Sequence, residues 1–177
     1  MQHSAPKGSE GSYGRFMAMV GTSTAMMFGL MYLNTYQLDH LFWSETRFWM
    51  TFVMGAVMAV VMLLFMWGMY RNRAKNWAIM AIAVLVFVGA LFLVRSQATI
   101  DDSEWMSAMI PHHSIAILTS ERANIDDPRV RKLADSIIKA QRREIAEMKW
   151  LIDDIEIHGI AANEADAAAR PVPKFAH

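Results

Sequence analysis

The sequence of 177 residues predicts an all-α membrane protein in which three transmembrane helices precede a helical hairpin. Its composition indicates the membrane, because 54% of the residues are apolar and only 19% are charged, against about 25% charged residues in soluble domains. The distribution of charge indicates two parts. Residues 1–96 contain seven Lys or Arg and three acids, while residues 97–177 contain ten Lys or Arg and fourteen acids.

Three apolar stretches lie within residues 16–95, which we expect to form the membrane domain. They cover about 16–36, 48–70 and 77–94, and none contains a charged residue. Each is as long as the roughly 17–25 residues that a helix needs to cross a bilayer. The first is the weakest, because the hydroxyl side chains of residues 22–24 dilute it. We read it as a retained span and not as a cleaved signal peptide.

A short basic loop sets the expected topology. Residues 71–75 contain two arginines and a lysine, and short loops rich in Lys and Arg remain in the cytoplasm. With three spans, the disordered N-terminus (1–15) is then cytoplasmic and the chain after residue 94 is periplasmic. The expected location is therefore the bacterial inner membrane, with several spans and the lipid bilayer as a partner.

The periplasmic part, residues 99–158, is predicted to be a hairpin of two helices. Asp101 followed by Glu104 indicates the start of the first helix, and Asp127 with Pro128 indicates the start of the second. Gly159 is a helix stop, and residues 160–177 are expected to be a disordered tail. Because a lone hairpin cannot close a core, we expect a homo-oligomer, with a dimer forming a four-helix bundle.

One end of this hairpin gathers the side chains that carry chemistry. Helical spacing places two methionines on the face of a His-His pair that follows Pro111, and the return helix adds a third methionine. The candidate metal ligands are Met106, Met109, His112, His113 and Met148. Thioether and imidazole donors suit a soft ion, and copper, as Cu(I), is the expected cofactor. Gln141 and Glu144 would not bind the metal themselves but would orient the histidine rings.

Two other interpretations of these side chains stay open. The methionines can be core residues, and the histidines can satisfy backbone groups that Pro111 leaves free. A second methionine series in the middle apolar stretch is either a packing surface or a soft-metal ladder. Its members are Met50, Met54, Met58, Met62, Met66 and Met69.

The motifs around the histidines resemble a known family. Residues 109–113 (MIPHH), 127–131 (DPRVR) and 141–148 (QRREIAEM) are similar to the domain-of-unknown-function 305 family, and the three-span start resembles its membrane-anchored branch. The resemblance implies that the hairpin is half of a ferritin-like four-helix bundle, and it implies copper binding and copper tolerance in the periplasm. The chain departs from many relatives at residues 118–120, where Leu, Thr and Ser replace expected soft ligands.

The expected function is that of a periplasmic copper-binding protein for copper homeostasis or tolerance, anchored in the membrane. We expect no enzymatic activity and no nucleic-acid partner, and copper-handling proteins are candidate partners. The chain contains no cysteine, which excludes disulfides, iron–sulfur clusters and a cysteine nucleophile. The alternative is a structural or regulatory membrane module whose hairpin mediates oligomerisation or partner binding without metal.

Overall fold

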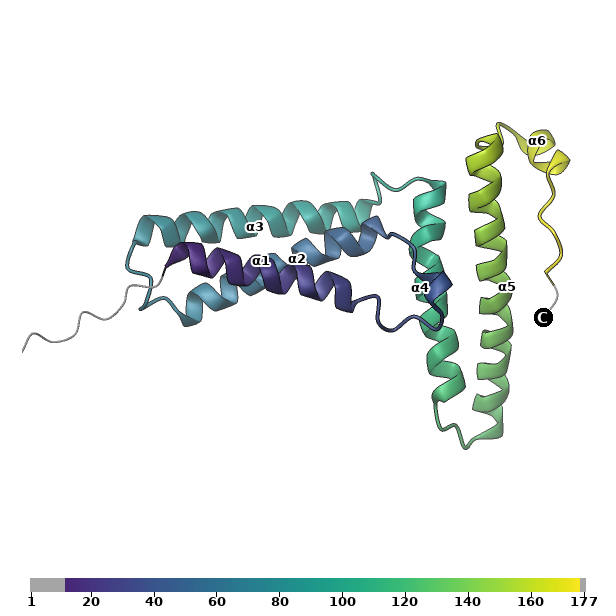
Figure 1. Cartoon of the computed structure of the whole chain (residues 1–177), viewed down its shortest axis with the longest axis horizontal. Coiled ribbons are helices and arrows are strands. Elements are labelled where there is room, and N and C mark those ends of the chain that lie inside the picture. Colours follow the sequence, from purple (N-terminus) through teal and green to yellow (C-terminus); the bar gives the residue numbers. More distant parts are fainter. Residues whose placement is uncertain (1–11, 176–177) are drawn as a thin grey trace, which may run out of the picture. The chain divides into compact units, whose positions relative to one another are not determined.

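The computed structural model describes residues 12–175, and these residues form helices joined by short connections (Figure 1). The prediction of an all-α chain is confirmed. The chain divides into two compact units, one formed by residues up to 30 together with 48–98, and the other by residues 31–47 together with 99–177. The expected disorder of residues 1–11 and 176–177 lies outside the described residues, whereas residues 13–15, which were also expected to be disordered, belong to the first helix.

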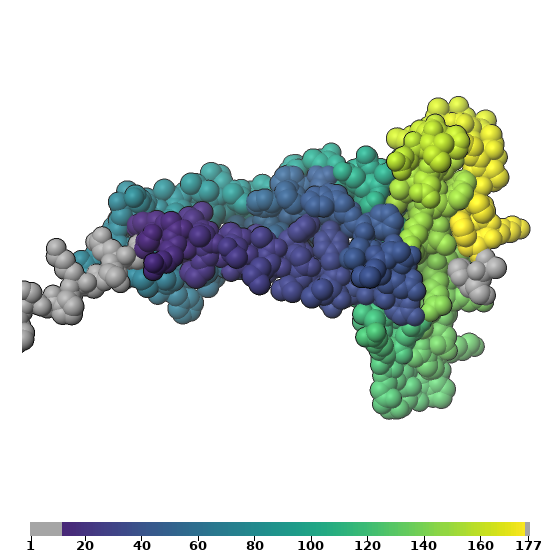
Figure 2. Space-filling view, in the orientation of Figure 1, coloured from purple at the N-terminus to yellow at the C-terminus, as the bar shows by residue number. Residues whose placement is uncertain are grey.

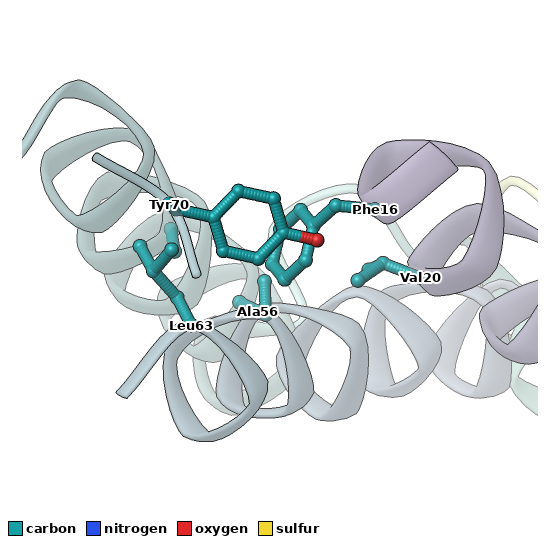
Figure 3. Close-up of a cluster of buried hydrophobic side chains, with 7 residues drawn as sticks. Phe16, Val20, Ala56, Leu63 and Tyr70 are labelled. Atoms are coloured by element: carbon teal, nitrogen blue, oxygen red, sulfur yellow. The ribbon is translucent and has the colours of Figure 1, made fainter. Parts of the chain in front are cut away.

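The first unit contains α1 (Tyr13–Leu30), α2 (Glu45–Phe65) and α3 (Arg73–Ser96). Its core is a cluster around Phe16, Val20, Leu63 and Tyr70, which Figure 3 shows with the Tyr70 ring beside Phe16. The two ring centroids are 5.5 Å apart with an edge-on geometry, which aromatic pairs favour. This edge-on contact therefore holds the start of α1 against the connection between α2 and α3.

The expectation of three transmembrane helices is wrong, because only α2 and α3 are long and apolar enough to span a membrane among the described residues. The 18 residues of α1 are at the lower end of the roughly 17–25 residues that a spanning helix needs, so its polar residues decide the outcome. Arg15 and the polar run at residues 22–24 lie within α1. The cytoplasmic N-terminus depended on that third span and has no support without it.

Close packing explains why α1 nevertheless accompanies α2. A β-carbon at Gly55 of α2 would lie 2.7 Å from the Thr24 hydroxyl of α1, closer than real contacts allow. Glycine therefore lets the two backbones approach, as small residues do between membrane helices. Tyr13, at the start of α1, donates a hydrogen bond to the Asn76 side chain of α3 at 2.7 Å.

The second unit is built on α4 (Asp102–Arg122) and α5 (Pro128–His158), which lie side by side (Figure 1). The expected caps are confirmed. The Asp101 carboxylate accepts the Glu104 N–H at 2.8 Å, the Asp127 carboxylate accepts the Arg129 N–H at 2.8 Å, and Gly159 ends α5 with a positive φ of 78°. Beyond it, a short helix, α6 (Glu164–Ala169), lies in the tail that was expected to be disordered.

Residues 31–47, here called the docking segment, pack on this hairpin although they connect α1 to α2. Between α1 and α2 the segment forms one short element, the 3-10 helix η1 (Leu38–His40), and its last three residues are the first of α2. Figure 2 shows it in dark blue against the green hairpin. Tyr36 and Phe42 of the segment contact the hairpin core around Ile110, Ile117 and Ile145. The sequence analysis placed these residues with the membrane domain, whereas their contacts place them with the hairpin.

Candidate metal centre

His113 lies at the centre of the candidate site, in the middle of α4. Its Nδ1 is 2.9 Å from the Met109 carbonyl oxygen, one helical turn earlier. A carbonyl oxygen can only accept a hydrogen bond, so Nδ1 carries the proton and Nε2 is the atom that the ring offers to the opposite helix. This is the tautomer that a metal-binding imidazole requires when its Nδ1 is hydrogen-bonded to backbone.

Glu144 of α5 faces that nitrogen. Its Oε2 lies 3.0 Å from His113 Nε2, and the exposed fraction of the two side chains is 13% for the histidine and 37% for the glutamate. The second carboxylate oxygen is 3.7 Å from the Arg143 guanidinium. A hydrogen bond between Nε2 and Oε2 needs a proton on one of these atoms, so an ion bound at Nε2 would take the place of that proton. Glu144 therefore touches the candidate donor atom itself.

The methionines of the candidate site belong to the core of the hairpin. Met106 and Met148 are buried, with 5% and 7% of their surface exposed, in one cluster with Ile110, Ile117 and Ile145. Met109 packs against the same cluster. The hairpin thus brings thioethers from both helices together with a half-buried imidazole that lies one turn away. Such a set of sulfur and nitrogen donors suits a soft monovalent ion better than a hard divalent one.

Two predicted residues lie apart from this arrangement. His112 is exposed, and its ring centroid is 6.2 Å from that of His113, because neighbouring residues on a helix point about 100° apart. Gln141 is half-buried on α5, and its side chain makes no hydrogen bond to either histidine within residues 12–175. The described part of the chain also contains no group of three or more His, Asp or Glu side chains placed to hold a metal, so a metal here would depend on sulfur.

The residue next to His113 was not among the predicted site residues. Ser114 is completely buried, and its hydroxyl accepts the Tyr36 N–H of the docking segment at 2.6 Å. The same hydroxyl lies 2.9 Å from Nδ1 of His40, which is 6% exposed. The only available signal was that serine interrupts an apolar helix face, which is too common to predict a contact 74 residues away.

Charged groups surround His40 and hold the docking segment on α5. The Lys149 ammonium donates to the Asp39 carboxylate at 2.6 Å and thereby lowers the pKa of Asp39 below its ordinary value. Burial lowers the pKa of His40, and the nearby Lys149 cation lowers it further. His40 is therefore in its neutral form at pH 7, in which it can share the Ser114 hydrogen bond.

Comparison with known proteins places the hairpin in a defined sequence family. The family described as "Domain of unknown function (DUF305)" matches residues 93–163. The chain is also 34% identical over 109 residues to "Uncharacterized protein L153" of Acanthamoeba polyphaga mimivirus, a match that covers 60% of this chain and 70% of that protein. No solved structure matches the chain.

Proposed function

The chain belongs to the family described as domain of unknown function 305, and from this membership and the donor set of the hairpin we propose that it is a membrane-anchored periplasmic copper-binding protein. It would serve copper homeostasis or tolerance and bind Cu(I) through His113 and the methionines. The observation that carries the proposal is the Nδ1 hydrogen bond of His113 to the Met109 carbonyl, which directs Nε2 as a ligand atom towards Glu144 of the opposite helix.

Each residue has a separate part in this proposal. His113 supplies imidazole nitrogen, and Met109 and Met148 supply sulfur from the two helices, with Met106 behind them. Glu144 either shares the ion or yields Nε2 to it. A thioether has no proton to lose, so sulfur donors keep their affinity while the nitrogen competes with protons. Bound copper would supply a soft cation, and the chain would supply imidazole nitrogen and thioether sulfur as donors.

The experiment that tests the copper site is a competition titration with a cuprous chelator, carried out on protein in mild detergent under reducing conditions. We expect His113→Ala and Met109→Leu to weaken copper binding most, Met148→Leu measurably, and His112→Ala less. Leucine conserves the volume of methionine, so the methionine variants remove sulfur and leave packing nearly unchanged. Met19→Leu, on an exposed position of α1, is the matched control.

A second candidate function has an observation in its favour, because both ring nitrogens of His113 already have hydrogen-bond partners. On that reading the hairpin is a structural module that mediates oligomerisation or partner binding without metal. The same titration decides between the two. Equal copper affinity of the wild-type protein and His113→Ala, with lower stability of the variant, would favour the structural module and exclude the copper site.

We infer the membrane orientation from the loop between α2 and α3. Arg71, Arg73 and Lys75 lie at this end, and a short basic loop stays in the cytoplasm, so two spans return the chain to the periplasm before α4. A periplasm-specific reporter fused after Phe175 is expected to be active. Activity of a cytoplasm-specific reporter at the same position would place the hairpin in the cytoplasm and refute the periplasmic part of the proposal.

A further inference from the structure

A cavity of about 230 Å³ lies between the docking segment and the hairpin, apart from the candidate metal ligands. Ile117 of α4 and Ile145 of α5 form apolar parts of its wall, and the polar parts come from His40, Arg142 and Lys149. Three separate stretches of chain therefore contribute to one concave surface. Small-molecule sites have this construction, in which an apolar surface carries a few convergent polar groups.

Hydrogen bonding fixes which nitrogen of His40 carries a proton. The Ser114 hydroxyl accepts the Tyr36 N–H at 2.6 Å, and its own hydrogen has one partner among residues 12–175, the Nδ1 of His40 at 2.9 Å. Nδ1 is therefore the acceptor, and the neutral ring carries its proton on Nε2. That nitrogen has no hydrogen-bond partner in the same stretch of chain, since Asp39 Oδ1 lies 3.8 Å away, beyond hydrogen-bond range.

The two cations of the cavity wall are held by carboxylates that water reaches. Lys149 pairs with Asp39, whose side chain is 64% exposed, and Arg142 pairs with Glu121. Lys149 and Glu121 are only partly exposed, at 28% and 29%, so a bound anion would share the two cations with these carboxylates and would not need to displace them. Arg142 also approaches the Tyr36 hydroxyl, with Nη2 3.4 Å from the oxygen.

From this arrangement we propose that the cavity binds the oxyanion group of a small molecule, a carboxylate, phosphate or sulfate, between His40 Nε2–H, the Lys149 ammonium and the Arg142 guanidinium. All three groups are donors, and an ionised oxyanion is an acceptor with the matching charge. A short apolar portion of the same molecule would lie on Ile117 and Ile145. A metal cation is disfavoured there because the two cationic side chains repel it.

Titration with inorganic sulfate tests this proposal, because the charge of sulfate does not change between pH 6 and pH 8. Ionic strength is held constant with chloride, and the ¹⁵N signals of the histidine rings are recorded in detergent. We expect the His40 Nε2 signal to be that of a protonated nitrogen and to shift with saturation, while the exposed His158 ring does not respond. A linear shift common to both rings would show that sulfate acts only as bulk salt and would overturn the site.

Variants identify the side chains that hold the anion. Arg142→Gln and Lys149→Gln are expected to weaken sulfate binding about tenfold or more, as the loss of a charged hydrogen bond does. Lys132→Gln, which removes an exposed lysine of the same helix, is the matched control. If all three variants weakened sulfate binding equally, the cause would be the lower net charge of the protein, and the cavity would be refuted as the site.

Two further measurements complete the experiment. The first separates loss of anion binding from loss of structure, and the second separates binding of a free anion from binding of a lipid. Amide exchange at Tyr36 shows whether the docking segment stays on the hairpin in Arg142→Gln, which leaves the Lys149–Asp39 pair intact. Methyl phosphate and a short-chain phosphatidic acid are then compared. A response to the lipid alone would contradict the proposal of a free small molecule, whereas a response to methyl phosphate supports it.

Discussion

The contact between Ser114 and the docking segment gives the sharpest test of the second unit. Ser114→Ala removes one oxygen atom, and with it the acceptor of the Tyr36 N–H and the donor to His40 Nδ1. Both former partners belong to the docking segment, and His40 is 94% buried, since 6% of its surface is exposed. The variant is therefore expected to weaken docking without a large change in shape.

The expected loss of docking free energy follows from the loss of two hydrogen bonds in one substitution. A buried polar group that loses its partner costs about 1–3 kcal/mol. If the two losses together cost about 2–4 kcal/mol, the population of the undocked segment rises about 30- to 800-fold, at roughly 1.4 kcal/mol per factor of ten. Opening of a local segment limits amide exchange, so exchange within residues 31–47 should accelerate by that factor.

Hydrogen exchange of the intact protein in mild detergent measures this effect peptide by peptide. The docking segment is expected to exchange faster in Ser114→Ala, while α3 keeps its wild-type rate. Ser136→Ala, which removes an exposed hydroxyl of α5 that bonds only the Leu133 carbonyl, is the control. Unchanged exchange of the docking segment would refute the argument that Ser114 anchors it.

Three further predictions concern packing and pH. Gly55→Ala should lower thermal stability by about 1–3 kcal/mol through overpacking, since the new β-carbon would lie 2.7 Å from Thr24 Oγ1; Gly89→Ala, with open space around it, should not lower it. Burial lowers the pKa of His40 below 6.5 in the docked state, so His40 binds a proton more readily when the segment is undocked. Docking should therefore weaken as the pH falls below about 6.5 and stay constant above it. Amide exchange of the docking segment at several pH values measures this effect. Ile110→Ala, at a fully buried position, should destabilise the hairpin by about 2–5 kcal/mol in denaturant titrations.

Local signals in the sequence were sufficient to predict where the two helices of the hairpin begin and where the second one ends. An aspartate before each helix and a glycine after the second act through bonds to residues two to four positions away, so no distant information is needed. The prediction that the first apolar stretch spans a membrane was wrong, also for a local reason. Its apolar content was counted over residues 16–36, whereas the helix ends at Leu30 and includes three consecutive hydroxyl residues.

The partner of His113 could not be derived from the position of the turn alone. A turn centred near Asp126 would by counting place His113 opposite residue 139, whereas its side chain meets Glu144, five residues further along α5. Side chains lean towards the N-terminus of their own helix. In an antiparallel hairpin this moves the His113 side chain away from the turn and the α5 side chains towards it, so contacting residues are shifted along the second helix.

The docking segment was the part of the fold that no sequence pattern indicated. Between α1 and α2 it contains one three-residue element, so it has no helical period, and its hydrogen bonds to α4 join residues more than 70 positions apart. Only the three-dimensional structure brings His40, Ser114 and Lys149 together. The cavity that these groups border was therefore beyond the reach of an analysis based on spacing.

The same segment makes the second unit a discontinuous domain. The chain passes between the units at three places, near residues 30, 47 and 98, so no single cut releases the hairpin with all its parts. A soluble fragment that begins at residue 99 would lack Tyr36, Phe42 and His40, and it would leave the Ser114 hydroxyl and the neighbouring apolar cluster uncovered. Removal of α1, α2 and α3 together with their connections thus also removes a piece of the core of the second unit, and a fragment that keeps this core must include residues 31–47 along with the hairpin.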